Sequence, residues 1–331
     1  MEKITLRHGD GGRQTSRLIS QVFYRHFGQP DKNGCLDAAL LKFEQARIAF
    51  TTDSFVVKPL FFSGGDIGKL AVCGTVNYLA ASGAIPLYLC ASFVIEEGFA
   101  LEQLDTIAAS MQQVCNQVGA RIVTGDTKVV EKGLVDGVFI NTAGIGVVHA
   151  DFTPQTIQSG DAIILTGSIA EHGTVILTER YPLGISGDFK SDCAPLSAII
   201  PALDGLLKHV RLMRDPTRGG LATALCEMAE HADLSAVIDQ TRLPITPQVA
   251  ALHQMLGTDP LYFACEGRML LIAAKGYEAA ILSQLKTLSY CRDSTIIGHF
   301  EGNKDRVWMR TLLGGEVLIS MLENHMIPRI C

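Results

Sequence analysis

The chain has 331 residues, roughly twice the length of a common domain, which is enough for two independently packed cores. Its 47% hydrophobic and 19% charged residues exclude a disordered chain, and its net charge of -6 argues against a surface for nucleic acid or an anionic membrane. The opening residues MEKITLRHGDGG lack the apolar run of a secretory signal, and no segment has the roughly 18 apolar residues of a spanning helix. We therefore expect a cytoplasmic protein that binds neither nucleic acid nor a membrane.

The first half of the chain contains patterns of both helix and strand. Apolar residues at helical spacing predict helices at 18–27 and 101–118. Runs of β-branched and aromatic residues with glycine at their ends predict strands at 47–57, 120–124 and 135–148. Because these elements do not alternate regularly, the pattern does not indicate a doubly wound fold.

The second half follows a change of composition at 150–160, where Pro, Gly and polar residues replace an apolar strand. Buried strands are predicted at 161–166 and 269–274, and helices at 221–231 and 277–288. Both halves mix helix and strand, so the predicted fold class is α+β with two domains.

We place the first domain at 1–155, the second at 156–320 and a mobile tail at 321–331. The chain has nine cysteines, an odd number, and no C-x-x-C pair that would indicate a metal or dithiol site. Most of them are expected to be reduced and buried. Cys331 is the exception, because the end of a chain normally lies at the surface and not in a core.

Three glycine-rich acidic segments have the composition of phosphate-binding loops: GDGG at 9–12, GGDIGK at 64–69 and RDPTRGG at 214–220. Such loops expose backbone N–H groups to phosphate oxygens, and their carboxylates can hold the accompanying magnesium. The alternative for each is an ordinary turn with a helix cap. GGDIGK is not a Walker A loop, because only three residues separate its outer glycines and leucine follows its lysine.

Two further carboxylates, Asp53 in TTDSF and Asp126 in TGDTK, are expected where strands end. Ligands often bind loops at strand ends, and hard oxygen ligands from separate loops suit magnesium bound to phosphates. The alternative is that each aspartate caps a turn.

Several segments occur in an order that is typical of one family: HGDGG, TTDSFVV, PLFFSGGDIGKLAVCGT, ASGAIP, VTGDTKVV, FINTAGIG, RDPTRGGLA, CEGR and a final PRIC. Over essentially the whole chain they resemble the HypE family of hydrogenase maturation factors. This family is part of the PurM-like superfamily, whose aminoimidazole ribonucleotide synthetase and selenophosphate synthetase share only looser aspartate and glycine signals.

The resemblance implies a PurM-like fold in which an N-terminal α/β domain binds ATP and pairs with its copy to form a homodimer. It also implies a reaction. A HypF-type carbamoyltransferase transfers a carbamoyl group to the terminal cysteine, and ATP is used to dehydrate this S-carboxamide to a thiocyanate. The cyanide then passes to iron on a HypC–HypD complex, for assembly of NiFe-hydrogenase.

The resemblance also assigns roles to individual residues. It implies that Cys331 carries the group, and that Glu266 and Lys128 supply a base and a charge stabiliser, in an order that the sequence leaves open. Without the resemblance, Glu266 would be interpreted as a surface acid beside a strand. The implied Mg²⁺ ligands are Asp53, Asp126 and Asp215. The residues expected to bind ATP are Asp10, Gly11, Gly12, Asp66, Lys69, Thr127 and Arg218.

One residue departs from the family pattern. In VNYLAASGA, Tyr78 stands where the family commonly has Asp after Asn. A neutral phenol is a poor magnesium ligand. Either the neighbouring aspartates suffice, or the nucleotide binds more weakly than in the rest of the family.

Two other functions remain open at this stage. The chain could be another PurM-like enzyme that activates an oxygen of a free small molecule, although such a substrate needs no terminal thiol. It could also be a non-catalytic scaffold for maturation partners, an interpretation that Tyr78 motivates. ATP hydrolysis with and without a carbamoylated tail would distinguish the three.

Overall fold

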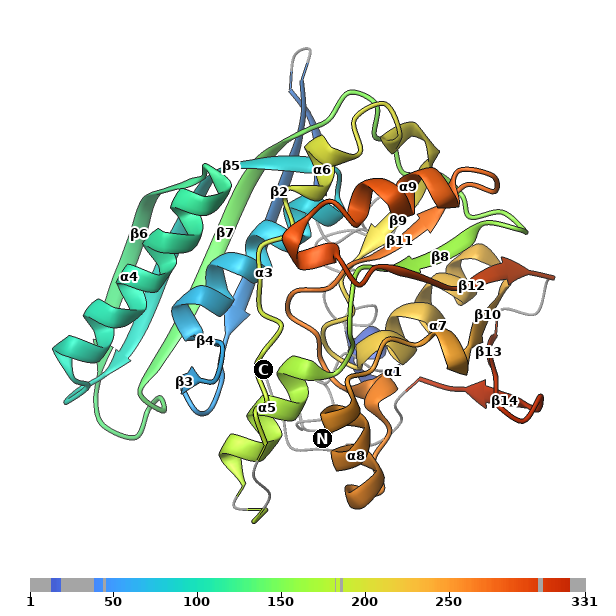
Figure 1. Ribbon diagram of the computed structural model, residues 1–331. Coiled ribbons are helices and arrows are strands. Elements are labelled where there is room, and N and C mark those ends of the chain that lie inside the picture. Colours follow the sequence, from blue (N-terminus) through green and yellow to red (C-terminus); the bar gives the residue numbers. More distant parts are fainter. Residues whose placement is uncertain are drawn as a thin grey trace.

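The computed structural model describes residues 13–18, 39–43, 46–181, 183–184, 187–302 and 306–321. Its main features are two β-sheets, one from each half of the chain, which lie on either side of a long buried helix (Figure 1). A short helix, α1 (Arg13–Leu18), precedes the first sheet in the sequence. The predicted α+β class with two domains is confirmed.

The N-terminal sheet has five strands. Their order is β1 (Ala39–Phe43), β2 (Ala46–Phe55), β7 (Val138–Val148), β5 (Ala84–Glu96) and β6 (Arg121–Val130). Neighbouring strands are antiparallel except for β5 and β6, which are parallel and are connected by α4 (Leu101–Val118). Strand β6 is an edge of this sheet.

Helix α3 (Ile67–Ala81) covers one face of this sheet and follows a small hairpin of β3 (Phe61–Phe62) and β4 (Gly65–Asp66). The sequence did not predict this helix. Thirteen of its 15 residues are buried, so it has no polar face and no amphipathic period to detect. It is capped by Asp66, whose carboxylate accepts the N–H groups of Gly68 and Lys69 in place of missing helical partners.

The C-terminal sheet has seven strands, which are flanked by helices. Their order is β14 (Glu316–Ile319), β13 (Val307–Arg310), β10 (Ser235–Asp239), β12 (Thr295–Glu301), β8 (Ala162–Leu165), β11 (Leu270–Ala273) and β9 (Val210–Arg214). The helices of this half are α5 (Glu171–Arg180), α6 (Ile199–Ala202), α7 (Gly220–Ala232), α8 (Pro247–Leu256) and α9 (Glu278–Leu285). Short 3-10 turns lie at Leu207–His209, Gln240–Arg242, Pro260–Tyr262 and Ser289–Cys291.

The two halves share a hydrophobic core, because the second side of α3 packs against the C-terminal half. Leu79 near the end of α3 belongs to the same buried cluster as Leu196 and Met213. On its first side, α3 lies so close to β7 that a Cβ atom at Gly144 would stand 2.7 Å from the Thr75 methyl group. Only glycine fits there without moving the helix.

Most predicted elements are confirmed to within three residues at each end. They are the strands predicted at 47–57, 135–148, 161–166 and 269–274 and the helices predicted at 101–118, 221–231 and 277–288. The helix predicted at 18–27 lies outside the described residues except for Leu18, the last residue of α1.

The predicted end of the strand at 120–124 is wrong. Strand β6 continues to Val130, because its later residues stay in register with β5 as far as the pair Glu96–Val130. Asp126 therefore lies inside a strand and not in a loop after it, and Asp53 likewise lies inside β2. Along the ranges that the structure describes, no helix is both long enough and apolar enough to cross a membrane.

Candidate active site

Asp53 lies on the face of the N-terminal sheet that α3 covers. The phenol of Tyr78, on α3, donates a hydrogen bond of 3.0 Å to Asp53 Oδ2, and the Ser54 N–H donates to Asp53 Oδ1 at 2.7 Å. Each carboxylate oxygen keeps a second lone pair, so Asp53 can still bind a cation. Tyr78, the residue that departs from the pattern expected from the resemblance, thus contacts a predicted metal ligand directly.

Asp126 and Lys128 lie on the opposite face of the same sheet. In the strand register, Asp126 on β6 lies opposite Ser92 on β5, and Ser92 lies opposite Asn141 on β7. The Asn141 side chain donates a hydrogen bond of 2.9 Å to Ser54 Oγ on β2, so these residues share one face of the sheet. Successive residues of a strand alternate between faces, and Asp53 therefore faces the other way from its neighbour Ser54. We call the face that bears Asp126 the open face.

The two charged side chains on the open face are exposed to solvent. Lys128 Nζ lies 3.6 Å from Asp126 Oδ2, and the two side chains are 71% and 61% exposed. Thr127, between them in sequence, is also exposed and faces the side of α4. Within one chain, Asp53 and Asp126 cannot bind the same ion, because the sheet separates them.

Asp66 and Lys69 have partners within the protein. Asp66 is buried, and its Oδ1 accepts the Ser110 hydroxyl at 2.6 Å in addition to two backbone N–H groups of α3. Lys69 Nζ donates to the Gly64 carbonyl at 2.7 Å. These contacts fix the start of α3, and a role of either residue in nucleotide binding stays a prediction.

Asp215 follows β9 and is only 6% exposed, whereas Arg218 in the same segment is exposed. The segment ends in Gly219 and Gly220, which have φ angles of 75° and 60°. A Cβ atom at Gly220 would lie 2.5 Å from the Leu261 carbonyl oxygen, so glycine is required at this position. Strand β9 packs against α3, which places Asp215 on the α3 side of the molecule.

Glu266 lies in the loop before β11, where the two halves of the chain meet. It is 6% exposed, so the interpretation as a surface acid is wrong. Its N–H donates to Asp192 Oδ1 at 3.4 Å, and its carbonyl accepts the Asn77 side-chain amide at 3.2 Å. The backbone groups on both sides of its Cα atom, the N–H and the carbonyl, are therefore hydrogen-bonded to other segments.

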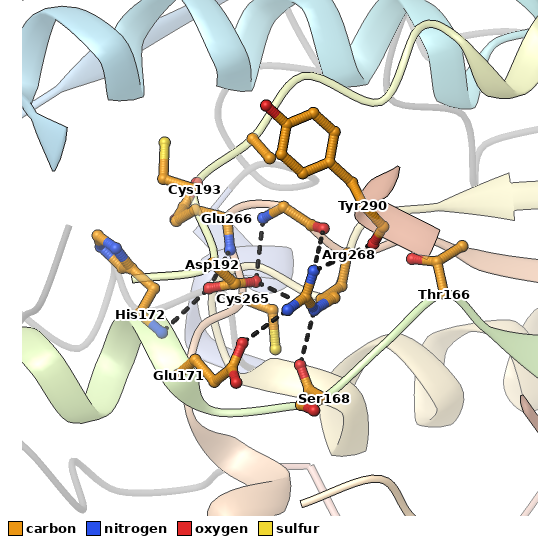
Figure 2. A network of polar contacts seen from close by, with 12 residues as sticks. Thr166, Ser168, Glu171, His172, Asp192, Cys193, Cys265, Glu266, Arg268 and Tyr290 are labelled. Carbon is orange, nitrogen blue, oxygen red and sulfur yellow. Dashed lines mark hydrogen bonds and ion pairs between the residues drawn. The ribbon is translucent and has the colours of Figure 1, made fainter. Parts of the chain in front are cut away.

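Asp192 and Arg268 form the centre of this network (Figure 2). The Asp192 side chain is fully buried and accepts the N–H groups of His172 at 3.0 Å and Gly267 at 3.1 Å. Arg268 Nε lies 3.7 Å from Asp192 Oδ2, and its Nη2 donates to Glu171 Oε2 at 2.6 Å. A buried charge needs such partners, since an unpaired one would be costly to remove from water.

Burial and charge act against each other in this network. Burial lowers the pKa of Arg268, but the negative charges of Asp192 and Glu171 outweigh it and raise the pKa overall. Burial raises the pKa of Glu171, and the charge of Arg268 opposes this only in part. The guanidinium therefore stays charged and holds the loop of Glu266 against α5.

His172 is a buried histidine beside this network. Its Nδ1 lies 2.8 Å from Ser191 Oγ, and its ring packs edge-on against Phe62 at 5.2 Å between centroids. Burial lowers the pKa of His172 to about 4, although the negative charge of Asp192 opposes the shift. The folded protein therefore holds this ring neutral.

This shift predicts a loss of stability in mild acid. Between pH 6.5 and about 4 the unfolded chain protonates His172 and the folded protein does not, so the free energy of unfolding falls as the pH falls. The loss is roughly 3 kcal/mol, at about 1.36 kcal/mol for each pKa unit. Urea unfolding at pH 7 and pH 4.5 is expected to show a smaller difference in His172→Asn than in the natural sequence. His231→Asn, at an exposed position, is the control; equal pH dependence in all three proteins would contradict the assignment.

Sequence reasoning missed three residues of this region: Asn77, Asp192 and Arg268. Asn77 and Arg268 belong to the segments VNYLAASGA and CEGR, so their neighbourhood was identified although they were not. Asp192, in SDCAPL, carries no signal in its spacing, because its partners are 20, 74 and 75 residues away in sequence.

Four predicted site residues, Asp10, Gly11, Gly12 and Cys331, lie outside the described residues. The other nine fall into four places. Asp53, Asp66, Lys69 and Asp215 lie on the α3 side, Glu266 lies in the buried network, and Asp126, Thr127 and Lys128 lie on β6, while Arg218 is exposed beside α7.

Comparison with protein families matches both halves of the chain. Residues 36–148 match the N-terminal domain of AIR synthase related proteins, and residues 158–309 match the C-terminal domain of the same family. The chain is 42% identical to carbamoyl dehydratase HypE of Rhodobacter capsulatus over 100% of this chain and 98% of that protein. It is 38% identical to carbamoyl dehydratase HypE of Escherichia coli over the full length of both.

Solved structures give the same result. The chain is similar to HypE in a HypE–HypF complex, with a TM-score of 0.87, 40% identity, and coverage of 92% of this chain and 99% of that one. It is also similar to HypE in complex with ATP, with a TM-score of 0.82, 40% identity, and coverage of 99% and 100%. A more distant likeness, at 16% identity with a TM-score of 0.65, is to a ThiL protein and shows the fold alone.

Proposed function

Since the chain belongs to the HypE family of AIR synthase related proteins, we propose that it is an ATP-dependent carbamoyl dehydratase of hydrogenase maturation. The observation that carries the proposal is the similarity to carbamoyl dehydratases at about 40% identity over the whole length. The site adds a physical reason. Glu266 is a carboxylate held inside the protein at the junction of its two halves, where it can be kept from bulk water during a reaction.

The substrate is proposed to be a carbamoyl group bound as an S-carboxamide to Cys331. Its oxygen is a poor leaving group. Transfer of the terminal phosphoryl group of ATP to that oxygen gives ADP and a phosphate ester, so that phosphate becomes the leaving group. The nitrogen then loses its two protons, the C–O bond breaks, and a thiocyanate and phosphate form. Glu266 and Lys128 are the candidates for the base and for the group that neutralises developing negative charge.

The described carboxylates fit magnesium, which ATP-using enzymes commonly require. Asp53 retains free lone pairs on both oxygens, and Asp215 directly follows β9, the strand that packs against α3. We propose that these two residues hold Mg²⁺, which would neutralise phosphate charge. Asp126 would join them only from a second copy, because it lies on the open face.

A second copy of the chain is the proposed partner of the open face. Apolar side chains gather on this face at one end of the sheet, with 39% to 44% of their surface exposed: Phe50, Ile85, Tyr88, Ile145 and Val147. An exposed apolar patch of this kind usually marks an interface. Asp126 and Lys128 lie on the same face, so pairing would also bring these site residues to a neighbouring chain.

The homodimer can be tested by sedimentation. The natural sequence is expected to sediment as a dimer at micromolar concentration, and Ile145→Asp, which puts a charge in the apolar patch, is expected to sediment as a monomer. Leu313→Asp is the matched control, since Leu313 is 95% exposed in the turn between β13 and β14 and outside the open face. A monomeric natural protein would contradict the proposal.

The protein partners follow from the same family. A relative forms a HypE–HypF complex, and we propose that a HypF-type carbamoyltransferase supplies the carbamoyl group here as well. We further propose that a HypC–HypD complex accepts the cyanide, and the cytoplasm stays the predicted compartment.

The function is tested with the full chain and a carbamoyltransferase of the HypF type. Cys331 is expected to gain the mass of a carbamoyl group, and the adduct is expected to lose the mass of water only after ATP is added. ATP hydrolysis with a free small molecule and no tail adduct would favour the other PurM-like enzyme. Binding of partners without any ATP-dependent change would favour the scaffold, which the contact of Tyr78 with Asp53 makes a specific alternative.

A further inference from the structure

Asn77 connects α3 with two loops of the C-terminal half. It is 1% exposed, and every polar group of its side chain is used. Its Nδ2 donates to the Ala194 carbonyl at 3.0 Å and to the Glu266 carbonyl at 3.2 Å, and its Oδ1 accepts the Leu196 N–H at 2.8 Å. A leucine or alanine would fill part of the space, but neither could make these bonds, so packing alone does not explain an amide here.

Asp192 holds the other side of Glu266. Its Oδ1 accepts the Glu266 N–H at 3.4 Å, and its Oδ2 accepts the Gly267 N–H at 3.1 Å. The backbone of Asp192 also comes so close that a Cβ atom at Gly267 would stand 1.8 Å from its carbonyl oxygen. The loop that contains Glu266 therefore packs against Asp192 on one side and is hydrogen-bonded to Asn77 on the other.

These contacts determine the direction of the Glu266 side chain. The N–H belongs to the peptide plane before its Cα atom and the carbonyl to the plane after it, so fixing both planes fixes φ and ψ. The direction of the Cα–Cβ bond follows from those two angles. Anchoring the backbone in this way reduces the number of positions that the Glu266 carboxylate can adopt.

Helix α3 also contacts the predicted metal site. The residue after Asn77 is Tyr78, whose hydroxyl donates to Asp53 at 3.0 Å. Adjacent residues of one buried helix thus contact Glu266 in one half of the chain and Asp53 in the other. The helix is capped and almost fully buried, so it can hold the two groups at a fixed separation.

We infer that Asn77 is a positioning residue that sets Glu266 relative to the nucleotide site on Asp53. This inference rests on the proposed dehydration of the carbamoylated Cys331. It assigns Asn77 no contact with the reacting atoms, and it holds whether Glu266 acts as the base or as the charge stabiliser.

The test is a single-turnover measurement on the full chain after carbamoylation. Asn77→Ala is expected to lower the rate constant of dehydration at saturating ATP by about 10- to 100-fold, the cost of a misplacement of roughly 1 Å. The ATP concentration at half-maximal rate is expected to stay within about 2-fold, because Asp53 and its neighbours are unchanged. A purely structural defect would not lower the rate constant of dehydration while leaving the ATP concentration at half-maximal rate unchanged.

A double variant separates positioning from general damage. Glu266→Asp keeps a carboxylate at a shifted position, and in that background Asn77→Ala is expected to change the rate by less than about 3-fold, because residues that act through one group are not additive. Equal effects of Asn77→Ala in both backgrounds would overturn the inference.

Two further variants keep the test decisive. Thr75 lies on the same helix as Asn77, and Thr75→Val removes its buried hydrogen bond to Thr142 on β7, so this variant is expected to lower the melting temperature but not the dehydration rate. If Asn77→Ala does not fold, Asp192→Asn perturbs the same backbone from its N–H side and is expected to give the same separation of rate from ATP dependence. An unchanged dehydration rate in Asn77→Ala, or in Asp192→Asn used in its place, would overturn the inference. If the natural sequence itself does not dehydrate its adduct, the proposed function fails instead.

Discussion

Cys331→Ala is expected to accept no carbamoyl group and to form no thiocyanate, while ATP binding is retained. Four of the described cysteines are poor substitutes for this thiol, since a thiolate is the nucleophile and their pKa values are raised. Burial raises the pKa of Cys291 to about 11 and that of Cys226 to about 12. The pKa of Cys193 is raised well above its ordinary value, chiefly by a hydrogen bond with Cys73 and next by burial. Burial likewise raises the pKa of Cys265 well above its ordinary value.

The measurement is the intact mass after incubation with the transferase, with and without ATP. Cys90→Ala is the matched control, because Cys90 is a half-buried thiol on β5 and is not fully buried as most of the described cysteines are. It is expected to react like the natural sequence. A Cys331→Ala chain that still gains and dehydrates a carbamoyl group would show that another thiol carries the group.

Asp53→Ala is expected to weaken binding of ATP with Mg²⁺ by about 10- to 100-fold, which corresponds to about 1.4 to 2.8 kcal/mol. The substitution removes a proposed metal ligand and also leaves the Tyr78 hydroxyl without its bond to that carboxylate. Isothermal calorimetry with and without Mg²⁺ checks the result. An unchanged affinity would remove Asp53 from the site.

Two variants of Tyr78 complete this experiment. Tyr78→Asp places a second carboxylate beside Asp53, so it is expected to tighten ATP binding in the presence of Mg²⁺ and not in its absence, where like charges repel. Tyr78→Phe removes only the hydroxyl and serves as the control. If Tyr78→Asp leaves the affinity with Mg²⁺ unchanged, the neighbouring ligands already compensate for the tyrosine.

Helices with two distinct faces could be predicted from the sequence, and helices without them could not. The spacing of Ile107, Met111 and Val114 predicted α4 with the bounds that the structure has, because one face is buried and the other is exposed. Helix α3 was not predicted, because both halves of the chain cover it and it has no exposed face. A helix of this kind can be recognised only when its surroundings are known.

The sequence by itself determined the two-domain class and the family, because these follow from segments such as VTGDTKVV and CEGR, and the roles of the site residues stay predictions. Tertiary structure alone decided how those residues are grouped. Asp53 is in register with Thr142 on β7, and Asp126 is in register, through Ser92 on β5, with the preceding residue Asn141. Because side chains alternate along a strand, the two aspartates lie on opposite faces of the sheet. Glu266 is buried because Asn77, 189 residues earlier, and Asp192, 74 residues earlier, bond its backbone. Contacts between segments so far apart depend on how the whole chain packs, and no local pattern encodes them.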